Sequence, residues 1–116
     1  MARRVTTDLS WQPLGEIAWL LQLAADHLWE AADSAGIDSP LHSLGLGSFL
    51  AASRATEMLP ADRQEPDHFT SGSDDVVQVL TEAEQLIHQL DPRMGGVSDL
   101  TMVVADLVRE ARHSAA

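Results

Sequence analysis

The residues whose spacing best fits metal chemistry are Glu110 and His113, near the end of the chain. A Glu-x-x-His pair on a helix presents both side chains to one face, and di-iron bundles use two such pairs with two further inward-pointing Glu residues. The predicted helices hold one pair, and its helical angle places it opposite most of the apolar stripe of its own segment. We therefore expect no metal site and no cofactor, with Glu110 and His113 as the candidate ligands should a metal bind.

The motifs of common enzyme classes are missing from the sequence. The chain has no Cys, which removes thiol nucleophiles and cysteine metal sites. Gly95-Gly96 joins two predicted helices and follows no strand, so it lacks the context of a phosphate-binding loop. Ser, His and Asp are present, but no strand–turn–helix segment presents a serine nucleophile. We expect a protein that is not an enzyme.

The charge balance narrows the classes of partner. The chain has 18 acidic residues against seven arginines, and its formal net charge is −11. Nucleic-acid binding rests on clustered cations, so we expect no nucleic-acid partner. The longest apolar runs are too short to span a membrane, and no signal-peptide core follows the N-terminus, so we expect a cytoplasmic protein without membrane contact. The absence of Lys, Asn and Tyr, whose codons are AT-rich, favours a bacterial source.

Helix start and stop signals divide the chain into four segments. Ser10 is a suitable N-cap with Pro13 in the first turn, and Gly36 supplies a left-handed stop. Apolar residues at helical spacing fill the segments, and none shows the alternation of a strand. The sequence thus predicts an all-α four-helix bundle with helices at about 10–35, 40–59, 74–90 and 98–113. Residues 1–9 are expected to form a flexible tail, and residues 10–116 a single domain with a polar crossing loop at 60–73.

The first predicted helix is apolar on too many sides for an ordinary amphipathic helix. Its expected bundle face consists of Leu14, Ile17, Leu21, Ala24, Leu28 and Ala31. Trp19 and Leu23 fall within the polar stripe, and Trp11 and Trp29 lie at its edge. Exposed Trp and Leu side chains anchor protein interfaces, so these four residues are the candidate interface. Alternatively, this helix is central and is covered by the tail and the 60–73 loop.

The second predicted helix is rich in small residues, with Gly47, Ala51 and Ala55 recurring every four positions. This pattern favours close helix packing within the chain over a dimer seam. We predict a non-enzymatic interaction or self-assembly module that acts through the first helix, as a homodimer or with a protein partner. The alternative is a small-molecule or metal-binding bundle, with a pocket near Trp11, Trp29, Phe49 and Met58.

Overall fold

The computed structural model describes the backbone of residues 2–36, 40–59, 75–91, 93 and 95–115, and side chains from residue 13 to residue 113 of these ranges. Within them the chain forms four helices and no strand, as the sequence predicted. No helix of the described residues is long and apolar enough to cross a membrane. The helices are α1 (Ala2–Ala35), α2 (Leu41–Glu57), α3 (Val76–Ile87) and α4 (Val97–Ala115).

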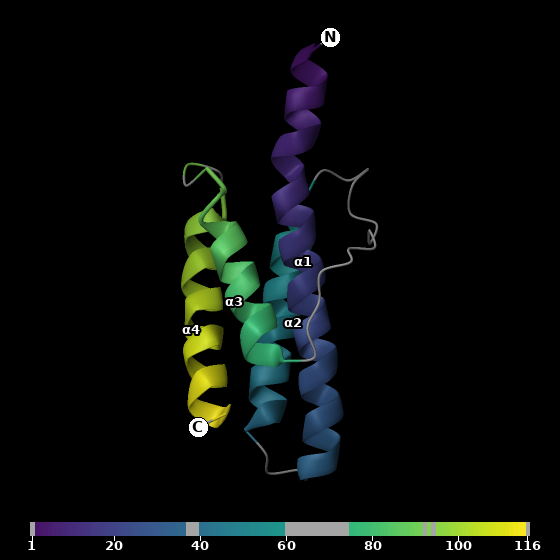
Figure 1. The fold of residues 1–116 in the computed structure, drawn as a ribbon, viewed down its shortest axis with the longest axis vertical. Coiled ribbons are helices and arrows are strands. Elements are labelled where there is room, and N and C mark those ends of the chain that lie inside the picture. The colour runs from purple at the N-terminus through teal and green to yellow at the C-terminus, as the bar shows by residue number, and fades with distance from the viewer. Residues whose placement is uncertain (1, 37–39, 60–74, 92, 94, 116) are drawn as a thin grey trace.

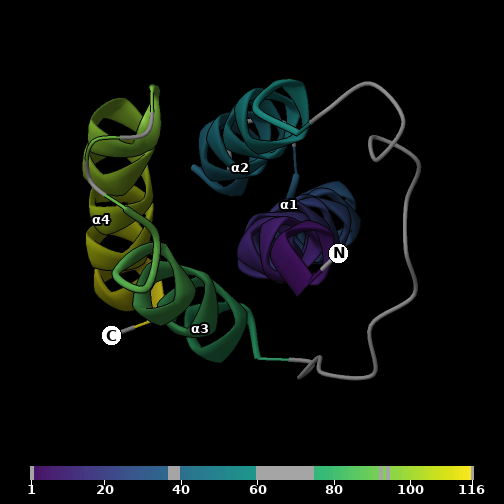
Figure 2. The same ribbon diagram turned by 90° about the horizontal axis from the view of Figure 1, so that it is seen from above.

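The four helices stand at the corners of a square (Figures 1 and 2). α1 packs against α2 and α3, and α4 packs against the same two helices from the opposite corner. Every neighbouring pair runs antiparallel, whereas α2 and α3, on one diagonal, run in the same direction (Figure 1). Each helix therefore has two neighbours and one outer face. The predicted 60–73 loop between α2 and α3 lies outside the described residues.

The start of α1 corrects the sequence prediction. The helix begins at Ala2 rather than near Ser10, so residues 2–9, expected as a tail, are helical. Pro13 therefore lies inside the helix, where it removes one backbone hydrogen bond, and not in the first turn. Residues 2–9 contain no Gly or Pro to stop a helix, and the Ser10 signal alone does not end it. In Figure 1 the N-terminal part of α1 extends beyond the other helices.

α1 ends at Ala35 as predicted, and the bounds of the other three helices differ from the predicted ones by one to three residues. Gly36 adopts the predicted left-handed conformation, with φ of 108°, and its N–H donates to the Ala32 carbonyl. The Asp75 carboxylate accepts from the Val77 N–H and caps α3. After Ile87 the chain tightens into i→i+3 hydrogen bonds, which shortens α3 relative to the predicted end at 90. α4 begins at Val97, one residue before the predicted start at 98.

The core is built from one apolar face of each helix. On α1 the predicted bundle face is buried from Leu14 to Leu28, but Ala31 is exposed and Ala32 is buried in its place. The next buried residue after Leu28 thus lies four positions further along the helix, whereas the predicted face continued after three. The buried residues of α3 and α4 recur at helical spacing on one face of each helix: Val79, Leu80, Ala83, Ile87, Val97, Leu100, Val104, Leu107, Val108 and Ala111.

Candidate protein-interaction surface

Of the predicted interface residues of α1, the side chains of Trp19, Leu23 and Trp29 are described, and these three do not form one exposed surface. Trp19 and Leu23 are half-buried and pack against the core cluster. Trp29 is also half-buried, but it lies ten residues beyond Trp19, about 15 Å further along the helix. Trp11 belongs to α1, and its side chain lies outside the described residues. The surface near Trp29 is therefore distinct from the surface near Trp19.

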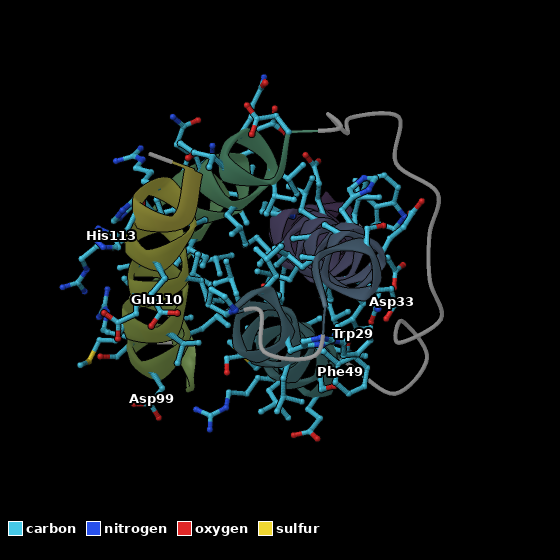
Figure 3. The ribbon with its side chains drawn as sticks, turned by 90° about the horizontal axis from the view of Figure 1, so that it is seen from below. Trp29, Asp33, Phe49, Asp99, Glu110 and His113 are labelled. Atoms are coloured by element: carbon cyan, nitrogen blue, oxygen red, sulfur yellow. The ribbon has the colours of Figure 1, made fainter. Side chains whose placement is uncertain are left out.

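Trp29 lies against α2, where it pairs with Phe49. The two ring centroids are 5.5 Å apart and the rings are inclined by 39°, a tilted aromatic contact (Figure 3). Gly45 makes this approach possible, because a Cβ at that position would lie 2.7 Å from Trp29 Cδ1 and 2.8 Å from Nε1. The missing side chain of Gly45 thus provides the space for the Trp29 indole between α1 and α2.

The predicted small-molecule pocket is only partly assembled. Trp29 and Phe49 meet, but Met58 directly follows the end of α2, nine residues after Phe49 and about 14 Å away along the axis. There Met58 approaches the turn before α4, since a Cβ on Gly96 would lie 3.2 Å from its Sδ. The structure therefore brings two of the four pocket candidates together and places Met58 at another part of the bundle.

The outer face of α2 carries three exposed apolar residues, of which the sequence analysis singled out Phe49 alone. Leu46, Phe49 and Leu50 are 51%, 37% and 55% exposed, and they account for three of the four exposed large apolar side chains in the described part of the chain. Their i, i+3, i+4 spacing puts them side by side on the helix. We call these three residues, with Trp29 beside Phe49, the apolar patch.

A signal for this patch was present in the sequence. Small residues take up the face of α2 that packs inside the bundle: Gly45, Ser48, Ala51, Ala52 and Ala55 are buried. On a helical projection, Leu46 and Leu50 fall opposite this small-residue face. The sequence analysis already favoured packing of the small residues within the chain, and the large apolar residues opposite them are the signal that identifies the patch.

Carboxylates border the patch on α1. Asp26 and Asp33 lie one turn before and one turn after Trp29, and both are exposed, as is Glu30. In Figure 3, Asp33 and Trp29 project from the same side of α1. The Gln22 amide donates to the Asp26 carboxylate, which leaves its negative charge in place. We call Asp26, Glu30 and Asp33 the α1 acidic border.

A second set of carboxylates lies on α4, the other neighbour of α2. A Cβ on Gly47 would lie 3.0 Å from Leu107 Cδ2, which marks the contact between α2 and α4. One turn after Leu107, Ala111 is buried and Glu110 is exposed, so Glu110 lies on the outer side of this contact. Asp99 is exposed as well, and Figure 3 shows both carboxylates on α4. On α2 itself, exposed Arg54 is the basic residue of the last turn.

The candidate metal ligands Glu110 and His113 are both exposed on α4 (Figure 3). Among the described residues, no group of three or more His, Asp or Glu side chains is arranged to hold a metal ion. The buried polar side chain in this part of the chain is Ser48, whose hydroxyl donates to the Leu44 carbonyl. The described core thus supplies no carboxylates of the kind that line a di-iron bundle.

Comparison with known proteins adds no relative: no protein-family model, no curated protein and no solved structure matches the chain.

Proposed function

We propose that the protein is a non-enzymatic interaction module that binds a protein through the apolar patch at the α1–α2 edge. The observation that carries the proposal is the exposure of Leu46, Phe49 and Leu50 side by side on a helix whose opposite face is fully packed. The proposed surface includes Trp29 from the predicted interface on the first helix, but most of its residues belong to α2.

The free energy that the exposed apolar side chains would gain on burial supports this choice of surface. Fully burying a Leu or Phe side chain is worth about 1.5–3 kcal/mol, and this stabilisation is incomplete for each residue of the patch in the isolated chain. Clustered exposed apolar residues are typical of binding sites, and an aromatic pair such as Trp29–Phe49 is a common anchor of an interface. The occupant is either a second copy of the chain or a different protein.

A charged substitution in the patch tests the proposal. In Leu50→Asp the patch acquires a carboxylate that a bound partner would have to bury, so binding should weaken at least tenfold. Met102→Asp is the matched control, because Met102 is a 66% exposed apolar residue on α4, outside the patch. Circular dichroism should show the same helix content for both variants and the wild type.

The measurement has two parts. Sedimentation velocity on the purified proteins shows whether self-association is lost in Leu50→Asp and kept in Met102→Asp. Affinity purification from the native host, followed by mass spectrometry, shows whether other proteins are captured by the wild type and Met102→Asp and lost from Leu50→Asp. Monomers throughout, together with an identical set of captured proteins for all three chains, would contradict the proposal.

A further inference from the structure

We infer that the occupant of the apolar patch is a basic amphipathic helix of another protein, packed lengthwise on α2. This inference rests on the proposed function and names the partner's chemistry. It follows from two independent features of the surface: the helical spacing of the exposed apolar residues, and the sign of the charges on both sides of them.

The shape of the patch fits a helix. Leu46, Phe49 and Leu50 form a short ridge of i, i+3 and i+4 side chains, the arrangement that interdigitates with the side chains of a second helix. α2 has 17 residues, about 25 Å, which is enough for four turns of a partner. Its outer face would then be covered as its inner face already is, by helix-on-helix packing.

The charge of the partner follows from the borders of the patch. On the α1 side lie Asp26, Glu30 and Asp33, and the α4 side carries Asp99 and Glu110. Arg54 is the opposing charge on α2. A partner helix with Leu or Phe on one face and Lys or Arg along its flanks would place cations next to the α1 acidic border on one side and next to the acidic border of α4, Asp99 and Glu110, on the other. Such complementarity favours the right partner and accelerates its encounter.

The same charges argue against a second copy as the occupant. A two-fold pairing through α2 would bring together two chains that each carry a net charge of −11. It would also place the acidic borders of the two copies close to one another, where like charges cost free energy. Anionic membrane surfaces are disfavoured for the same reason.

Synthetic peptides provide the test. The first is an 18-residue helix-forming peptide with Leu at the positions of one face and Lys and Arg along both flanks. The second keeps the same Leu positions and carries Glu on the flanks, and the third keeps the cations but scatters the Leu residues around the helix. Isothermal titration calorimetry against the full chain should show the basic amphipathic peptide binding at least tenfold more tightly than either control, and less tightly as NaCl is raised.

Protein variants locate the binding. Leu50→Asp should abolish binding of the basic peptide. Glu30→Gln with Asp33→Asn should weaken it about three- to tenfold, because two border charges are lost. Glu82→Gln with Glu84→Gln is the matched control: it removes the same charge from α3, which lies diagonally across the bundle from α2, and should change the affinity less than twofold.

Several results would overturn the inference, and they are distinct from failure of the proposed function. Equal binding of the basic and acidic peptides, no binding of the basic peptide, or equal weakening by the two double variants would each exclude a charge-matched helix. A dimer that is lost in Leu50→Asp, or adsorption of the chain to phosphatidylcholine or phosphatidylglycerol vesicles that is lost in the same variant, would also overturn it. The dimer result would leave the proposed function standing with a second copy as the occupant.

Discussion

At the residue scale, the position of Trp29 depends on the absence of a side chain at position 45. The indole occupies the volume that a Cβ on Gly45 would need, with atoms as near as 2.7 Å. Gly47, two residues later, faces a softer neighbour, because its Cβ would meet the flexible end of Leu107 at 3.0 Å. Both glycines lie inside α2, where Gly is less favourable than Ala by about 1 kcal/mol.

These two contacts give opposite expectations for the same substitution. Gly47→Ala should be neutral or stabilising, because Leu107 can move by a few tenths of an ångström and the helix gains propensity. Gly45→Ala forces a bulky ring to shift, and overpacking of this kind costs about 1–3 kcal/mol, so it should be less stable than Gly47→Ala by about 1–2 kcal/mol. Urea unfolding measures the difference, and Trp29→Leu in the Gly45→Ala chain should recover part of the loss. Equal stability of the two alanine variants would contradict the assigned contact.

At the element scale, the helices were predictable to the degree that their apolar residues marked one face. α3 and α4 each have a single apolar arc, and their buried residues match it. α2 has apolar residues on both faces, and periodicity alone does not say whether Gly45, Ser48 and Ala52 or Leu46 and Leu50 are buried. The answer depends on how closely α1 and α4 approach, which is a tertiary property. The start of α1 was missed for a related reason: Pro13 marks a possible beginning and leaves open whether the helix starts before it.

The two faces of α2 should respond differently to loss of a leucine. Leu44 is 3% exposed and belongs to the core cluster, so Leu44→Ala should cost about 2–5 kcal/mol of unfolding free energy. Leu50 is 55% exposed, and Leu50→Gln should change stability by no more than about 0.5 kcal/mol. Chemical denaturation of both variants checks this. A cost above about 2 kcal/mol for Leu50→Gln would show that the patch serves folding of the chain and weaken the case for a binding role.

At the scale of the whole molecule, the dominant feature is an unbalanced negative charge on a small helical bundle. The described ion pairs, Arg93 with Asp91 and Arg109 with Asp106, join exposed side chains and contribute little to stability. Because the chain carries a net charge of −11, its excess of carboxylates over cations produces a net repulsion, which favours expansion of the chain. The same field that is inferred to select a basic partner therefore lowers the stability of the isolated bundle.

Screening should reveal this repulsion as a stabilisation by salt. At about 0.01 M ionic strength the Debye length is near 30 Å, comparable to the width of the bundle, and at about 0.15 M it falls to about 8 Å. Raising NaCl over this range should therefore raise the midpoint of thermal unfolding by about 2–6 °C, the shift expected for roughly 0.5–1 kcal/mol in a domain of this size. Glu82→Gln with Glu84→Gln should start from a higher midpoint in low salt and gain less from NaCl, since it carries less of the repulsive charge. A midpoint that stays constant or falls as NaCl rises would mean that local attractive pairs outweigh the net repulsion. The carboxylates that border the patch would then be stabilised by contacts within the chain.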